Sequence, residues 1–306
     1  MTGFFQNQLF FGEETLNAVH LFIGGWFDYV MLWITVMGNE SFYLVVPPIL
    51  YWCFEKKRAL KIMIIFLISS ALNDIVKDFF QNPRPAPDKL VPGIRELNIA
   101  YRPRSPGFPS GHTQGAVAFW GPVFWYFRKL PIGILSISMI LLIPYSRLYL
   151  GVHYLGDVIG GYMIGIALLL LTIPGICLFD RYRERIHEAF LLTAALVVPI
   201  TILICSGGEY VYSSLGALSG LAAGAILAEK RIQFNPKNTA KAAVVKICIG
   251  LAGLVILKTG LKLVFPHHLL FNYARYVILG MWCSLIAPFI FSKITFLKGE
   301  IDENAA

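Results

Sequence analysis

The chain has 306 residues, of which 57% are hydrophobic and only 14% are charged, and its formal net charge is +8. A soluble globular protein carries about 25% charged residues, so this composition excludes an ordinary soluble domain. The basic residues lie in short loops between long apolar runs, which is typical of membrane topology signals and not of a nucleic-acid-binding surface. We therefore expect membrane lipids, and no nucleic acid, as partners.

Apolar runs near the length that crosses a bilayer recur along the whole chain. They predict an all-α fold, a polytopic transmembrane helical bundle of about nine spans, at 31–54, 62–80, 113–128, 131–147, 154–177, 188–205, 211–228, 242–264 and 270–292. The first span is interrupted by Gly38-Asn39-Glu40-Ser41, and Pro47-Pro48 would kink it.

The lysine and arginine residues predict how the bundle is oriented. Of the 26 lysines and arginines, 16 fall in the loops 55–61, 128–129, 180–187, 229–246 and 293–298. The positive-inside rule places these loops in the cytoplasm. An odd number of spans then puts the N-terminus outside, the C-terminus inside, and the opposite loops on the outer face.

The first chemical motif is Lys77-Asp-Phe-Phe-Gln-Asn-Pro-Arg84-Pro85 at the outer end of the second span. The prolines on either side of Arg84 prevent the helix from continuing, so we expect the lysine on a helix end and the arginine in a loop. Alternatively, Lys77 forms a buried ion pair with Asp74 or Asp78, because ionisable groups in membranes usually find partners.

The second motif, Pro109-Ser110-Gly111-His112, lies just before the third span. Its backbone N–H groups are therefore expected at a helix N-terminus, where free donors and the helix dipole attract anions. The alternative for Ser110 is the role of an ordinary helix cap.

The third motif runs from Ser146-Arg147 through His153 to Asp157. His153 and Asp157 are four residues apart at the start of the fifth span, so both lie on one helix face. A carboxylate there can bind one imidazole N–H and leave the other nitrogen free to attack. A histidine–carboxylate pair that only packs helices is the alternative.

Together the strings match every position of the three signature motifs of the type 2 phosphatidic acid phosphatase superfamily, also called the lipid phosphatase and vanadium haloperoxidase superfamily. The resemblance covers 77–157 and extends as a helical core over roughly 30–180. In six-span members the first motif follows the third span, whereas here it follows the second and four spans trail the core. That layout resembles sphingosine-1-phosphate phosphatases and glucose-6-phosphatases.

The resemblance implies a metal-independent phosphatase with no cofactor, in which His153 is the nucleophile, oriented by Asp157. It implies that His112 protonates the leaving oxygen and that the phosphate is bound by the remaining motif residues, Lys77, Arg84, Ser110, Gly111 and Arg147. The expected substrate is a lipid phosphate or diphosphate at the outer membrane face, where Tyr101 and Phe108 would lie at the interface. The alternatives are a lipid phosphotransferase, a sugar-phosphate phosphatase and a non-enzymatic scaffold.

The predicted domains are a phosphatase core over 1–180, additional transmembrane helices over 181–298 and a tail over 299–306. The short loops favour a prokaryotic plasma membrane, with the active site facing the periplasm or the exterior. The five cysteines show no pairing pattern, so we expect neither a disulfide framework nor a metal site. Gly216, Gly220 and Gly224, spaced by four, predict a ridge where two helices pack closely.

Overall fold

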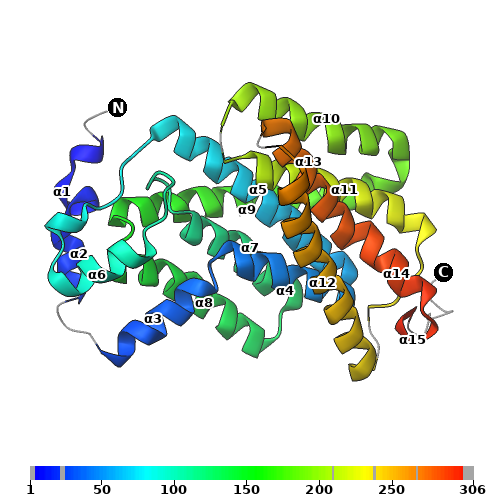
Figure 1. Ribbon diagram of the computed structural model, residues 1–306, viewed down its shortest axis with the longest axis horizontal. Helices are drawn as coiled ribbons and strands as arrows, with labels where there is room; N and C mark the ends of the chain where they lie inside the picture. The colour runs from blue at the N-terminus through cyan, green and yellow to red at the C-terminus, as the bar shows by residue number, and fades with distance from the viewer. Residues whose placement is uncertain (1–3, 21–24, 209, 237–238, 267, 299–306) are drawn as a thin grey trace. The chain divides into compact units, whose positions relative to one another are not determined.

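The computed structural model describes all residues except 1–3, 21–24, 209, 237–238, 267 and 299–306 (Figure 1). The described residues form helices and no strand, which confirms the all-α prediction. The predicted tail, 299–306, lies outside the described residues. The chain divides into two compact units, one of residues 1–43 and 72–174 and the other of 44–71 and 175–306. Residues 44–71, expected in the phosphatase core, thus group with the C-terminal helices.

Six helices are long and apolar enough to cross a membrane, and a bent pair brings the number to as many as seven. The six spans are 56–80, 130–149, 155–185, 188–206, 240–264 and 269–293. The remaining predicted spans near 113 and 211 are helical, as α7 (Gly111–Phe127) and α11 (Tyr212–Arg231), but neither is among the six. The protein is an integral membrane protein.

The first predicted span is two helices. The pair α3 (Trp26–Val36) and α4 (Glu40–Cys53) is bent by 56° at the short turn between them. The interruption expected around Gly38 is therefore confirmed, while α4 continues as a helix across Pro47 and Pro48.

The first unit is built around α7 and α8 (Leu130–Tyr149), which pack against each other, with α3 also packed on α8. It also holds the first part of α9 (Leu155–Tyr182) and the last turns of α5 (Lys56–Phe80). Its short helices are η1 (Phe4–Gln6), α1 (Gln8–Phe11), α2 (Glu13–His20), η2 (Pro87–Lys89) and α6 (Pro92–Tyr101).

A buried aromatic cluster joins the N-terminal helices of this unit to the loop before α7. The ring of Phe108 packs edge to face against those of Phe5 and Phe80, with centroids 5.5 and 5.1 Å away, and Phe11 and Tyr154 also belong to the cluster. Phe108 is thus buried by its aromatic neighbours, whereas Tyr101 is exposed.

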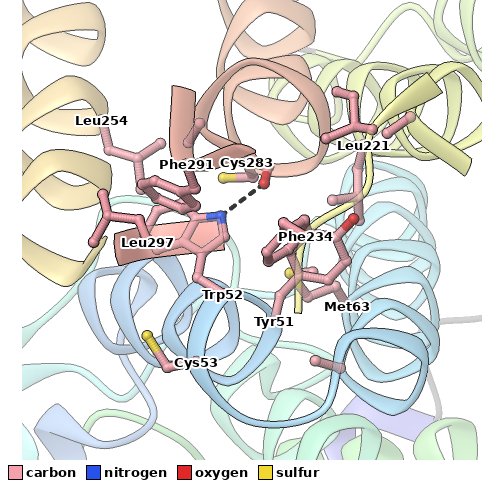
Figure 2. Packing of buried hydrophobic residues seen from close by; sticks show 14 of the residues in the cluster. Tyr51, Trp52, Cys53, Met63, Leu221, Phe234, Leu254, Cys283, Phe291 and Leu297 are labelled. Carbon is pink, nitrogen blue, oxygen red and sulfur yellow. Dashed lines mark hydrogen bonds between the residues drawn. The ribbon is translucent and has the colours of Figure 1, made fainter. Parts of the chain in front are cut away.

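The second unit contains the C-terminal helices together with residues 44–71 of α4 and α5. Its helices are η3 (Arg183–Arg185), α10 (Glu188–Ser206), α11, α12 (Ala240–Val264), α13 (Leu269–Met281), the π-helix η4 (Trp282–Ile286), α14 (Ala287–Lys293) and α15 (Thr295–Lys298). Figure 2 shows its core, in which Trp52 and Phe291 pack edge to face at 6.0 Å.

Two features fix the packing of this second unit. The glycine ridge on α11 lies directly against α13, because a Cβ atom on Gly220 would come within 1.9 Å of the Val277 carbonyl oxygen. This confirms the predicted close packing. In the π-helix, the indole N–H of Trp52 donates to the Cys283 carbonyl at 2.8 Å, the dashed line of Figure 2. A π-helix interrupts the regular pattern of backbone hydrogen bonds of an α-helix. The indole N–H of Trp52 supplies a donor to one carbonyl group of this segment.

Candidate active site

All eight residues proposed from the motifs lie in the first unit. They lie at the end of α5, in the loop that follows it, at the N-terminus of α7, at the C-terminal end of α8, in the turn after α8 and at the start of α9. The three cations are buried, since Lys77, Arg84 and Arg147 are only 6, 5 and 2% exposed. Burying cations is costly unless an anion or a hydrogen-bonding partner compensates them.

His153 is held between a carboxylate and a guanidinium. Its Nδ1 lies 3.1 Å from Oδ2 of Asp157, and its Nε2 lies 2.8 Å from Nη1 of Arg84. The same Asp157 oxygen accepts the backbone N–H of Tyr154 at 3.0 Å, which fixes the carboxylate at the first turn of α9. With Nδ1–H donated to the carboxylate, the lone pair of the neutral ring is on Nε2.

Arg84 is anchored by backbone and hydroxyl oxygens. Its Nε donates to the Ser105 carbonyl at 2.7 Å, and Nη1 also donates to the Val152 carbonyl at 2.8 Å. The Ser105 hydroxyl accepts from Nη2 at 3.3 Å and from Nζ of Lys77 at 3.4 Å, so one side chain links two of the cations. The carboxylates of Asp74 and Asp157 are close enough to Lys77 to interact with its charge.

The N-terminus of α7 closes onto the same residues. Ser110 is the N-cap of α7, where its Oγ accepts from the Thr113 N–H at 3.4 Å, and its own N–H donates to the Asp157 carbonyl at 2.9 Å. The expected helix-terminus position is confirmed, and so is the ordinary capping contact. A Cβ atom on Gly111 would lie 3.6 Å from Nζ of Lys77, so the backbone of the second motif lies beside the lysine of the first.

Arg147 and His112 contact the helix pair at the N-terminal side. Nη1 of Arg147 donates to the Thr35 hydroxyl at 2.5 Å, while its buried Nε has no hydrogen-bond partner among the described residues. Nε2 of His112 lies 2.8 Å from Oδ1 of Asn39. His112 is close enough to Arg147, Lys77 and Arg84 to interact with their charges.

Several residues of this site were not predicted from the sequence. Asn73 donates to the Gln114 side chain at 2.8 Å and so ties α5 to α7, and Asn82 lies 3.5 Å from Asp157. Ser105, Thr35 and Asn39 contact the motif cations or His112 as described above. A polar amide within an apolar span is itself a signal of a buried function, and Asn73, one helical turn before Lys77, shows that signal.

Burial and mutual repulsion set the charge states outside the membrane spans. Burial, and then the charges of Arg84, Arg147 and Lys77, lower the pKa of His153 well below its ordinary value. His153 is therefore neutral at neutral pH. Burial lowers the pKa of Arg84 to about 10, so its guanidinium remains charged. The site thus combines a neutral imidazole with buried cations, an arrangement of charge that is suited to a phosphate.

Two family models match the chain. The PAP2 superfamily model matches residues 58–181, which contain every motif residue, and the PAP2 superfamily phosphatase transmembrane extension matches residues 212–299. These two matches coincide with the helices of the site and with α11 to α15.

Relatives with similar sequences come from bacteria and mammals. Phosphatidylglycerophosphatase B of Bacillus subtilis (strain 168) is 29% identical over 190 residues, which are 58% of this chain and 86% of that protein. Sphingosine-1-phosphate phosphatase 1 of Rattus norvegicus is 25% identical over 283 residues, covering 87% and 60% of the two chains. Sphingosine-1-phosphate phosphatase 2 of Mus musculus is 24% identical over 203 residues, covering 64% and 55%. The matches therefore span little more than half of the two mammalian proteins. The PAP2 superfamily match contains the complete set of motif residues, and the extension match covers most of the remaining helices. The chain is a member of the PAP2 superfamily that carries the transmembrane extension.

Proposed function

We propose that this protein is a metal-independent membrane phosphatase that hydrolyses a lipid phosphate or diphosphate. One observation carries the proposal. Nε2 of His153 contacts the guanidinium of Arg84, which is one of three buried cations, while Nδ1 of the same neutral ring lies against Asp157. Such an arrangement suits a dianionic phosphate, since fixed positive charges stabilise the charge that develops during transfer.

In the first step the Nε2 lone pair of His153 attacks phosphorus and forms an N–P bond. The bond between phosphorus and the ester oxygen breaks, and the leaving oxygen takes the proton of the His112 imidazolium. The Nδ1–H of His153 remains donated to Asp157, which stabilises the positive charge on the ring. Lys77, Arg84 and Arg147, with the hydroxyl of Ser110 and the N–H of Gly111, bind the phosphate oxygens.

In the second step water attacks the phosphohistidine. His112, now neutral, takes a proton from the water as its oxygen bonds to phosphorus, and the N–P bond breaks with its electron pair returning to Nε2 of His153. Inorganic phosphate leaves, and both histidines are back in their starting protonation states. No step draws on a metal ion, because the three cations supply the positive charge.

Two observations favour a lipid phosphate over a sugar phosphate as the substrate. The curated relatives are named for lipid substrates, sphingosine 1-phosphate and phosphatidylglycerophosphate. In addition, α3 exposes Trp26, Tyr29 and Trp33, which are 73, 71 and 72% exposed. Their spacing places them on one helix face, and aromatic rings of this kind gather where a bilayer meets water.

The test is phosphate release by the purified protein in nanodiscs. A long-chain sphingoid or diacyl phosphate and glucose 6-phosphate are compared by kcat/KM, with His153→Ala as the inactive control. We expect the lipid to be the better substrate by at least tenfold. Equal or faster hydrolysis of glucose 6-phosphate would reject the lipid substrate and retain the chemistry.

A phosphotransferase would share the first step and pass the phosphoryl group to a lipid acceptor. The amount of inorganic phosphate relative to substrate consumed separates the two: a hydrolase gives one phosphate for each ester cleaved. A scaffold without activity would release none.

We further propose that the active site faces the periplasm or exterior of a prokaryotic plasma membrane and that the chain crosses this membrane nine times. The phosphatase core would extend over 1–180, followed by additional helices over 181–298. The asymmetry of the lysine and arginine residues supports this orientation. In a protein freed of its native cysteines, Asp88→Cys should react with an impermeant thiol reagent in intact cells, and Gln233→Cys should not. Both positions are exposed, so the reverse pattern would invert the orientation.

A further inference from the structure

The turn between α3 and α4 contacts two of the proposed site residues. Oδ1 of Asn39 lies 2.8 Å from Nε2 of His112, and the Thr35 hydroxyl accepts from Nη1 of Arg147 at 2.5 Å. Thr35 and Asn39 precede residue 58, where the PAP2 superfamily match begins. This part of the site is therefore supplied by a segment outside the matched region.

Gly38 shows how closely the turn approaches the histidine. A Cβ atom on Gly38 would lie 2.7 Å from Cδ2 of His112 and 2.8 Å from Cγ2 of Ile143. Since Asn39 contacts the adjacent ring atom, Nε2, the turn covers the Cδ2–Nε2 edge of the imidazole. The bend of 56° between the helices brings Asn39 to this edge while Thr35 remains on the buried face of α3.

We infer that Asn39 and Thr35 are positioning residues of the phosphatase reaction, Asn39 for the tautomer of His112 and Thr35 for the guanidinium of Arg147. The inference rests on the proposed function, in which His112 is the proton donor and Arg147 binds the phosphate. Neither Asn39 nor Thr35 takes part in the chemistry itself.

The chemistry of the amide defines what Asn39 does. Its carbonyl oxygen accepts the Nε2–H of His112, so the neutral ring has its lone pair on Nδ1 and the imidazolium carries a proton on both nitrogens. An acceptor stabilises the charged form, and His112 has to be charged to protonate the leaving group. Burial, and then the charges of Arg147, Lys77 and Arg84, act in the opposite direction and lower the pKa of His112 well below its ordinary value. Asn39 therefore helps to keep the acid protonated among three cations.

Two substitutions of Asn39 should move the pH profile in opposite directions. Asn39→Ala removes the acceptor, so the basic limb of the kcat profile moves to lower pH and kcat falls by about 10- to 100-fold, as for other supporting residues. Asn39→Asp supplies a charged acceptor, so the basic limb moves to higher pH. Ser41→Ala, an exposed neighbour, serves as the matched control and should change neither. A role limited to folding would lower the amount of active enzyme without moving the limb.

Two substitutions of Thr35 separate the hydroxyl group from the volume of the side chain. Thr35→Val removes the acceptor of Nη1 at nearly constant volume and should raise KM or lower kcat by about tenfold, because the guanidinium loses a fixed partner. Thr35→Ser keeps the hydroxyl and should retain most of the activity. Equal activity in Thr35→Val and Thr35→Ser would contradict this part of the inference.

A measurement independent of catalysis determines the tautomer directly. Protein labelled with 15N-histidine in nanodiscs gives ring-nitrogen signals for its six histidines, and His112→Gln assigns those of His112. In the neutral state the wild type should show a protonated Nε2 and a bare Nδ1, and Asn39→Ala should lose that preference while melting at a similar temperature. A protonated Nδ1 in the wild type would overturn the inference, even if phosphate release is normal. Conversely, a wild type that releases no phosphate refutes the proposed function, and the ring-nitrogen signals still decide whether Asn39 sets the tautomer.

Discussion

Nη1 of Arg84 and Nε2 of His153 are 2.8 Å apart, so the guanidinium donates to the nitrogen that is opposite Asp157 on the ring. In the proposed reaction this nitrogen attacks phosphorus. A phosphate bound to Arg84 would therefore lie where the lone pair of Nε2 points. The same contact helps to hold the imidazole ring in one orientation.

Arg84→Lys tests whether the planar guanidinium matters beyond its charge. A lysine keeps the charge but cannot make the separate bonds to Ser105, Val152 and His153. We expect kcat/KM for the lipid phosphate to fall by about 100- to 1000-fold, the usual cost of losing one donor to a developing charge. Arg104→Lys changes an exposed arginine of the loop between α6 and α7; it is the control and should retain wild-type activity. A fall of less than threefold in Arg84→Lys would contradict the proposed role.

Asp157→Asn tests the orientation of the nucleophile. The amide preserves volume but presents no charge to the imidazole, and it allows the other tautomer, in which Nδ1 carries the lone pair. Loss of the orienting carboxylate in a comparable His–Asp pair lowers kcat by about 10,000-fold, and we expect a fall of this order. Steady-state rates in nanodiscs measure it. Substantial activity in Asp157→Asn would show that Asp157 does not act through His153.

The acid limb of the pH profile follows from the environment of His153. Its pKa is lowered by burial and by the cations around it, so the ring becomes protonated only well below its ordinary value of about 6.5. Because the neutral form attacks, kcat/KM should not fall through protonation of this residue between pH 6 and pH 7. A phosphate monoester has its own second pKa of about 6, so the profile is corrected with the measured titration of the substrate. A residual acid limb centred near pH 6.5 would contradict the assignment.

Trp52→Phe tests the packing of the second unit. The substitution leaves the Cys283 carbonyl in the π-helix without the indole donor and removes part of a fully buried side chain. The lost hydrogen bond alone is expected to cost about 1–3 kcal/mol of unfolding free energy. Thermal melting in detergent measures the loss, and Trp33→Phe, at an exposed position, should leave the melting temperature unchanged. Since the motif residues lie in the first unit, kcat/KM well below the melting temperature should stay near the wild-type value.

The helices and the motif positions could be predicted because each depends on local sequence. The apolar runs predicted helix at all nine segments, and the prolines around Arg84 predicted the end of α5. The motif histidines and cations were recognised by residue type and spacing, and the glycine ridge of α11 by its repeat of four. The break between α3 and α4 followed from glycine and polar residues inside an apolar run.

Contacts between segments far apart in the chain could not be predicted in the same way. Thr35 and Asn39 carry no motif, and their contacts with Arg147 and His112 exist only after α3 and the turn that follows it have packed beside α7 and α8. The burial of Phe108 depends on rings supplied by the N-terminal helices, so its sequence neighbours gave no sign of it. Grouping residues 44–71 with the C-terminal helices likewise depends on long-range packing around Trp52.

The measurement that tests the central claim most directly is trapping of the phosphorylated enzyme. Protein in nanodiscs is mixed with a lipid carrying a 32P-labelled phosphate, quenched with alkali within milliseconds, and digested for mass spectrometry. Phosphohistidine is stable in alkali and labile in acid, so the account predicts alkali-stable label on His153. It also predicts that His153→Ala takes up no label and that His112→Ala, if it is labelled at all, is labelled on His153. Label on another residue, or turnover by His153→Ala at more than a few per cent of the wild-type rate, would contradict the account.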